Sequence, residues 1–260
     1  MKYIEVEIPE STAYLIPIGD IHIGDKAFKK EGRSKLLGYL NWVKERPNAR
    51  IFLNGDIFNC ASRVSKTSPF DVEHPENSSE FEQAVELFEP YKKQIIGAVD
   101  GNHEARLIDM FDASMLQVLC IHLGIQYCKW SAVVRLKVGK TERARGPWKQ
   151  NYWLYFHHTT GGGGTIGGKL NRVVKLNDII EGMDVFFGSH NHQLAVAPQD
   201  IYAPSCNAHN VIKRRVWYVD CGSYLEWNDS YAEKGMMAPA KLGSPRVRFD
   251  SSSHDVHVSL

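Results

Sequence analysis

The feature that most constrains the fold is a set of five polar clusters, each of which directly follows a short apolar run. The runs have the length of buried strands, and segments between them have the spacing of helices. Strands that alternate with helices indicate a parallel sheet, and open α/β folds bind ligands at the carboxyl ends of such strands. The five clusters are Asp20-Ile21-His22, Gly55-Asp56, Gly101-Asn102-His103-Glu104, His157-His158 and His190-Asn191-His192.

The first two clusters belong to one strand–helix–strand unit. Residues 13–18 form an apolar run, residues 34–44 carry apolar side chains at helical spacing, and residues 51–53 form a second short run. Ile21 separates Asp20 from His22, so both side chains share one face of an extended chain and can reach one metal ion. Taken alone, the pair is better explained as a turn aspartate and a surface histidine.

The rest of the chain also alternates between strand-like and helix-like segments. We expect strands over residues 3–8, 94–99, 125–138, 152–156, 184–187, 211–220 and 246–258, and helices over residues 81–91, 113–123 and 170–180. Another helix is expected to begin near Glu104. The 260 residues contain no repeat and no linker, so residues 1–260 are expected to form a single domain.

Two irregular segments leave alternatives open. Residues 60–80 form either a substrate-facing loop or a surface insertion with short helices. Residues 139–151 form either a solvated hairpin tip or a clamp on a nucleic-acid backbone with an aromatic side chain for stacking. The clamp would consist of Lys140, Arg143, Arg145, Trp148 and Lys149.

A glycine-rich run, residues 161–168, follows the fourth cluster. Residues 163–169 fit the pattern Gly-x-x-x-x-Gly-Lys, but Leu170 stands where a nucleotide-binding P-loop needs a Ser or Thr hydroxyl. We therefore exclude a P-loop. The glycines are expected to let the backbone pass close to the site and approach a phosphate.

Composition limits the class of protein. The net charge of +1 offers no overall attraction to nucleic acid, and the five scattered cysteines favour a reducing compartment over a disulfide framework. Residues 1–7 carry acids where a secretion signal has an apolar core, and no apolar run approaches membrane-spanning length. We expect a soluble, cytoplasmic protein.

Together the clusters supply two carboxylates, one amide and several imidazoles. This set is too large for one metal ion and suits two, about 3.5–4 Å apart and bridged by a carboxylate. Mixed nitrogen and oxygen ligands favour divalent transition metals, with manganese first and zinc, iron, nickel or cobalt as alternatives. Two carboxylates offset only part of the charge of two ions, so an anionic substrate is expected.

The ordered set of clusters resembles the calcineurin-like metallophosphoesterases. Its motifs span Asp20 to His192, and the glycine run together with residues 222–225 is similar to phosphoesterases of phages and prophages. The resemblance implies an α/β fold in which helices flank a two-sheet β-sandwich. It also implies a dinuclear site that hydrolyses phosphoric esters through a metal-activated hydroxide.

The resemblance further implies a role for each cluster. Asp20, His22 and His192 would hold one metal ion, and Asp56 would bridge to the second. Asn102, His190 and a histidine of the fourth cluster would complete the second ion's ligands. His103 would not bind metal but would stabilise the transition state or protonate the leaving oxygen.

Two departures from the family pattern affect the later clusters. The family has His-Gly where this chain has His157-His158-Thr159, and Ser189 here intervenes between Gly188 and the last cluster. We expect His158 to be the ligand, because it leads directly into the turn and strand alternation turns only one of the pair toward the site.

Phosphodiesters are the expected substrates, either nucleic acid or nucleotides. Phosphomonoesters are the alternative, although the protein phosphatases carry Asp-Arg-Gly after their Gly-Asp motif and this chain has Ile57-Phe58-Asn59. A nucleic-acid-binding module with a residual metal site is the nonenzymatic alternative. His190-Asn191-His192 does not indicate a His-Asn-His nuclease, because the required ββα unit is not evident.

Overall fold

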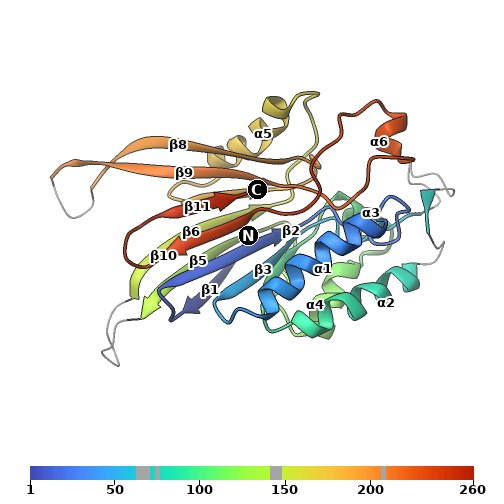
Figure 1. Ribbon diagram of the computed structural model, residues 1–260, viewed down its shortest axis with the longest axis horizontal. Helices are drawn as coiled ribbons and strands as arrows, with labels where there is room; N and C mark the ends of the chain where they lie inside the picture. The colour runs from blue at the N-terminus through green and yellow to red at the C-terminus, as the bar shows by residue number, and fades with distance from the viewer. Residues whose placement is uncertain (63–70, 74–76, 141–147, 206–208) are drawn as a thin grey trace.

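The computed structural model describes residues 1–62, 71–73, 77–140, 148–205 and 209–260. Two mixed β-sheets pack face to face, and helices lie against their outer faces (Figure 1). The larger sheet has the order β1-β5-β6-β7-β9-β8, and the smaller has the order β11-β10-β2-β3-β4. The expected layers of a two-sheet sandwich with flanking helices are thus present.

The larger sheet contains β1 (Lys2–Ile8), β5 (Ser131–Lys140), β6 (Trp148–His157), β7 (Val185–Gly188), β8 (Leu194–Pro204) and β9 (Val211–Cys221). The smaller sheet contains β2 (Thr12–Ile18), β3 (Ala49–Asn54), β4 (Ile95–Val99), β10 (Arg246–Asp250) and β11 (Val256–Ser259). The helices are α1 (Lys30–Lys44), α2 (Asn77–Phe88), α3 (Asn102–Phe111), α4 (Met115–Leu123), α5 (Ile166–Val174) and α6 (Tyr231–Lys234). Short 3-10 turns follow α2 and α5, namely η2 (Glu89–Tyr91) and η3 (Lys175–Asp178).

Strand alternation builds the core between the sheets. In β6, Tyr152, Leu154 and Phe156 face the smaller sheet, and the ring of Phe156 stacks on that of Phe52 with centroids 3.8 Å apart. The intervening Tyr155 faces α5 on the outer side of the sheet. A two-residue period therefore fills two layers from one strand.

The helices cover the outer faces through their apolar stripes. Leu36, Leu40 and Val43 of α1 pack on the smaller sheet together with α2 and α4, whereas Val173 of α5 packs on the larger sheet. Figure 1 shows α5 on the far side of the sandwich from α1, α2 and α4. Among the described residues, no helix is long and apolar enough to cross a membrane.

Three sequence predictions need correction. The strand expected from residue 125 begins at Ser131, because Tyr127 makes only an isolated bridge to Ala98. The helix expected from residue 170 begins at Ile166, since Thr165 caps the amide of Gly168, and α5 gives way to a 3-10 turn after Val174. Strand β8 was not predicted. It contains proline and polar residues, which an edge strand tolerates.

The arrangement of parallel strands explains why the polar clusters meet. Strands β2, β3 and β4 run parallel in one sheet, and β6 and β7 run parallel in the other. Each of these strands ends directly before one of the polar clusters or, for β6, within one. The carboxyl ends of both sheets therefore deliver their loops to one edge of the sandwich.

Candidate metal centre

The polar clusters form three overlapping groups of side chains. Asp20, His22 and His192 make one group, Asp56, His158 and His190 a second, and His22, Asp56 and His103 a third. In each group, one potential ligand atom per residue lies within 4.8 Å of the others. The first group consists of the three residues that the resemblance assigned to one ion. The second contains Asp56, His158 and His190 but not Asn102, which the resemblance also assigned to the other ion.

Five of these residues adopt a left-handed backbone. The φ angles are 50° for Asp20, 52° for His22, 51° for Asp56, 78° for His190 and 50° for His192. For residues other than glycine this conformation costs roughly 1–2 kcal/mol each. Strain of this kind persists where surrounding contacts enforce it, and it concentrates at functional sites.

Backbone contacts hold the two aspartate loops together. The amide of Asp20 donates to the carbonyl of Gly55 at 3.1 Å, and the amide of His22 donates to the carbonyl of Asp56 at 3.0 Å. The start of α3 closes on Asp56 from the other side. A Cβ at Gly101 would lie 2.1 Å from Asp56 Oδ1, so this approach requires glycine.

Glu104 holds these loops together; sequence reasoning placed it in the third cluster but assigned it no role. Its buried carboxylate accepts hydrogen bonds from the amides of Asp56 (3.0 Å), Ile57 (2.8 Å), Phe58 (3.0 Å) and Gly101 (2.8 Å). Burial, followed by the charge of Asp56, raises the pKa of Glu104 to about 7. A glutamate in the third position of a helix is a known capping signal, and it could have drawn attention to this residue.

The two aspartates direct one oxygen each into the cluster. Asp20 Oδ2 accepts from the amide of His190 at 2.8 Å, while Oδ1 lies 3.4 Å from His192 Nε2. Asp56 Oδ2 lies 3.2 Å from His158 Nε2 and 3.7 Å from His22 Nε2. Burial alone would raise the pKa of Asp56, but His158 and His103 outweigh it and hold that pKa well below its usual value.

Outer hydrogen bonds orient two of the histidines. His158 donates from Nδ1 to the carbonyl of Asn54 at 2.8 Å, which leaves Nε2 facing Asp56. Nδ1 of His192 lies 2.9 Å from the hydroxyl of Tyr231, which leaves Nε2 3.2 Å from His22 Nε2. Such outer partners usually set the orientation of metal-binding imidazoles. Tyr231 lies 39 positions from His192, and no local sequence signal links the two.

The structure brings His158, and not His157, into the cluster. His157 accepts the amide of Thr159 on Nδ1 at 2.8 Å, and it belongs to none of the metal-capable groups among the described residues. On the opposite side of the cluster, His190 Nδ1 directly faces the amide oxygen of Asn102. His158, His190 and Asn102 thus converge on the second group.

His103 is held as a neutral ring. Its Nδ1 donates to the carbonyl of Asn59 at 2.7 Å, and its Nε2 accepts from Arg106 Nη2 at 3.0 Å. Burial, followed by the charge of His22, lowers the pKa of His103 to about 3. The expected role as a proton donor therefore lacks support in this arrangement, because no proton resides on Nε2.

The donor atoms fit divalent transition metals. Asp20 Oδ1 and His158 Nε2 are buried and make no hydrogen bond of good geometry among the described residues. Their near neighbours, His192 Nε2 at 3.4 Å and Asp56 Oδ2 at 3.2 Å, are other potential ligands, so one cation could contact such a pair together. Imidazole with carboxylate and amide oxygen is a ligand set for manganese, iron, zinc, cobalt or nickel. These buried groups could hold a metal ion.

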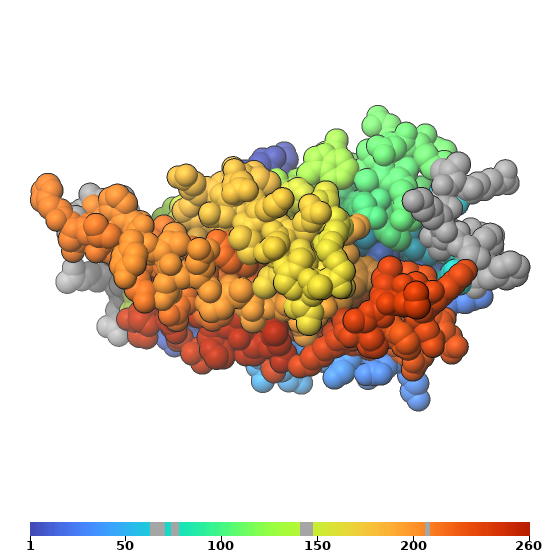
Figure 2. Space-filling model, turned by 90° about the horizontal axis from the view of Figure 1, so that it is seen from above, coloured from blue at the N-terminus to red at the C-terminus, as the bar shows by residue number. Residues whose placement is uncertain are grey.

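A cavity of about 850 Å³ opens above the cluster. One wall is the glycine run, in which a Cβ at Gly161 would lie 2.5 Å from His190 Nε2. The opposite wall is the segment around α6, with Trp227, Tyr231 and Met237. Figure 2 shows the yellow segment around α5 beside the red segment around α6. From the loop over residues 60–80, Asp71 reaches this cavity, whereas residues 63–70 and 74–76 lie outside the described residues.

The described part of the basic segment, Lys140 and residues 148–149, lies at the end of the β5–β6 hairpin farther from the site. Strands β5 and β6 form an antiparallel hairpin in which Ser131 pairs with His157 at the site and Lys140 pairs with Trp148 at the far end. The ten residues of β6 span about 30 Å. In Figure 1 this hairpin runs to the lower left, away from α3 and α6. Arg143 and Arg145 lie outside the described residues.

Comparison with known proteins adds no relative: no model of a protein family matches the sequence, and no curated protein matches it.

Proposed function

We propose that this chain is a phosphoesterase of the calcineurin-like metallophosphoesterase type that uses two divalent transition metal ions to hydrolyse phosphodiesters. The observation that carries the proposal is the pair of ligand groups that share one edge of the sandwich. Asp20, His22 and His192 would hold one ion, and His158, His190 and Asn102 the other. Asp56 would bridge them, because its Oδ2 lies 3.7 Å from His22 Nε2 in one group and 3.2 Å from His158 Nε2 in the other.

Ions bound there would act as Lewis acids toward a phosphate ester and would lower the pKa of a coordinated water. The protein's own residues determine the charge and the rigidity of the site. Two carboxylates balance half of the charge of two divalent ions, and the site therefore favours an anionic ligand. Glu104 and the carbonyl of Asn54 hold the ligand loops in place, so little rearrangement is needed when substrate binds.

The cavity supports a diester over a monoester. Its volume of about 850 Å³ far exceeds the space that a phosphate group needs, and its walls carry Ile166, Trp227, Met236 and Met237. These side chains offer apolar and aromatic surface to the organic groups on either side of a phosphodiester. The protein phosphatase alternative has no such support, because residues 57–61 after Gly55-Asp56 contain no Asp-Arg-Gly and no arginine.

The test is hydrolysis by purified protein loaded with manganese, zinc, iron, cobalt or nickel. We expect bis(4-nitrophenyl) phosphate to be cleaved faster than 4-nitrophenyl phosphate, with cyclic nucleotides and DNA as natural candidates. Elemental analysis should approach two ions per chain. Absence of hydrolysis in a doubly loaded protein would exclude the enzymatic proposal and favour a binding module. Faster cleavage of the monoester would exclude the diester preference.

A further inference from the structure

Arg106 is a charged residue of the cavity that the ligand assignments leave unexplained. It lies one helical turn after His103 on α3 and lines the cavity above the metal-capable groups. Its Nη2 donates to His103 Nε2 at 3.0 Å. Its Nη1 is buried and has no hydrogen-bond partner among the described residues. Within that part of the chain, the guanidinium contacts an imidazole and no carboxylate.

The Arg106 side chain is only half-buried, but its Nη1 is shielded from solvent and has no acceptor among the described residues. That is unfavourable for a charged donor, and an acceptor that binds in the cavity would satisfy it. The guanidinium fork matches the oxygens of a phosphate and can bind two of them at once. A phosphate ester in the cavity would bring such oxygens next to the same edge that holds Asp56.

His103 ties the guanidinium to the metal-capable groups. Its backbone amide donates to Asp56 Oδ1 at 2.8 Å, and its ring is clamped by the carbonyl of Asn59 on Nδ1. The ring also packs edge-on against His22, with centroids 4.3 Å apart. Two hydrogen bonds therefore connect Arg106 to Asp56 through one rigid residue. This linkage sets the guanidinium at a fixed place relative to the ligands of both proposed ions.

We propose that Arg106 binds the non-bridging oxygens of the substrate phosphate and that His103 is the positioning residue for its guanidinium. The inference rests on the proposed function and deepens it. Charge on these oxygens is what the protein must stabilise during phosphoryl transfer, and donors fixed in advance do so at no cost of reorganisation. The chain then supplies from α3 the arginine that is missing after Gly55-Asp56.

The test compares Arg106→Ala and Arg106→Lys with Arg46→Ala. Arg46 is a matched control because it stacks on Trp42 outside the cavity, 4.2 Å from the ring centroid. Calorimetry with inorganic phosphate and manganese-loaded protein should show affinity about 10–100-fold weaker in both Arg106 variants, the size of a charge-assisted bond. Metal content should be unchanged. Turnover of bis(4-nitrophenyl) phosphate should fall about 10²–10³-fold, mainly in kcat.

Added guanidinium should restore part of the turnover of Arg106→Ala and leave Arg46→Ala unaffected. A double variant, His103→Ala with Arg106→Ala, should lose little more than the worse single variant, because the two residues act as one unit. Wild-type phosphate affinity in Arg106→Ala, or metal loss in both Arg106 variants, would overturn the inference. Failure of the proposed function has a different signature, since the wild type would then hydrolyse no phosphate ester at all.

Discussion

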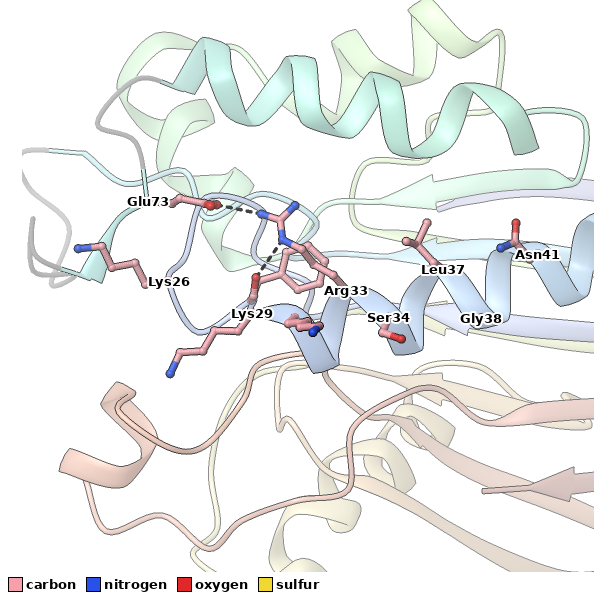
Figure 3. A pocket seen from close by; sticks show the side chains of 10 residues that line it. Lys26, Lys29, Arg33, Ser34, Leu37, Gly38, Asn41 and Glu73 are labelled. Carbon is pink, nitrogen blue, oxygen red and sulfur yellow. Dashed lines mark hydrogen bonds and ion pairs between the residues drawn. The ribbon is translucent and has the colours of Figure 1, made fainter.

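Two cavities of similar volume differ in the features that indicate a ligand-binding site. The cavity above the metal-capable groups measures about 850 Å³, and a second, beside α1, measures about 810 Å³. The second is rich in basic side chains and by volume alone would be an equal candidate. Figure 3 shows Arg33, Lys26 and Lys29 around it, together with Glu73.

The difference lies in how the lining groups are satisfied. Arg33 donates from Nη2 to Glu73 at 2.9 Å (Figure 3). Its guanidinium also covers the ring of Phe28, 4.7 Å from the centroid. Lys29 donates to the carbonyl of Asn228 at 2.6 Å. None of the described residues lining this cavity has a left-handed backbone or a buried polar side-chain atom without a partner. Backbone strain and buried polar atoms without partners, more than volume, distinguish the candidate metal centre from the second cavity.

The largest difference between the two cavities is expected for Asp56→Asn compared with Arg33→Ala. If Asp56 bridges two ions, as we propose, the variant weakens a ligand of both. Occupancy should then fall at both positions, and diester hydrolysis should drop on the order of 10³-fold or more. Arg33→Ala in the α1 cavity should leave both quantities at wild-type values. Metal analysis and steady-state rates measure them. Full loading and activity in Asp56→Asn would refute the bridging role.

The next test compares the neighbouring residues His157 and His158. Only His158 faces Asp56, whereas His157 contacts the backbone of Thr159. His158→Ala should remove an ion from the second group and abolish most activity, since His158 Nε2 faces Asp56. His157→Ala should retain both ions, because His157 only accepts the amide of Thr159. Metal counts on the two variants decide the matter. Loss of metal in His157→Ala alone would reverse the assignment.

His103→Ala should separate catalysis from metal binding. We expect both ions to remain bound while turnover falls about 10²–10³-fold, the same loss as for Arg106→Ala, because the guanidinium is then no longer held in place. His190→Ala is the matched comparison and should lose metal as well as activity. Equal metal loss in the two variants would show that His103 is a ligand, consistent with its place near His22 and Asp56.

The pH dependence of metal binding follows from the charge state of His158. Burial disfavours its protonated form, but Asp56 outweighs burial and raises the pKa of His158 to about 10 in the metal-free protein. A proton must therefore leave before Nε2 can bind a cation, so affinity should rise between pH 6 and 8, about tenfold per pH unit for each proton released. Manganese titrations in two buffers with different ionisation enthalpies would count the protons. Affinity independent of pH would contradict the assignment.

Particular residues show how far the sequence carried the interpretation. Asp20, Asp56 and His190 were identified because each follows an apolar strand, and a period of two or 3.6 residues can be read locally. Glu104, Tyr231 and Arg106 were missed as functional residues. The hydroxyl of Tyr231 meets His192 only after folding, and the amides that Glu104 binds come from another loop. Long-range contacts of this kind leave no periodic trace.

The left-handed backbone at the aspartates was equally unreadable. A glycine in the sequence can indicate a left-handed backbone. Asp20 and Asp56 adopt this backbone because hydrogen bonds between their two loops impose it. Strand β8 was not predicted because it contains Pro198, which is tolerated at the edge of a sheet. The basic segment was recognised, but its distance from the site depends on the direction of the β5–β6 hairpin, which pattern alone did not establish.

The distance between the far end of the β5–β6 hairpin and the candidate metal centre leads to the smallest predicted effect. If the segment held backbone phosphates of a single strand, log affinity would fall with log salt by about 0.7 per contact. Lys140 and Trp148, however, pair about 30 Å from the site end of the hairpin. Neutralising Lys140, Arg143, Arg145 and Lys149 should therefore leave the salt slope for a dinucleotide, and the rate with an aryl diester, unchanged. A flatter slope with long single strands alone would mean that the polyanion runs the length of the larger sheet. A flatter slope with the dinucleotide would place the basic segment at the site, against the observed hairpin.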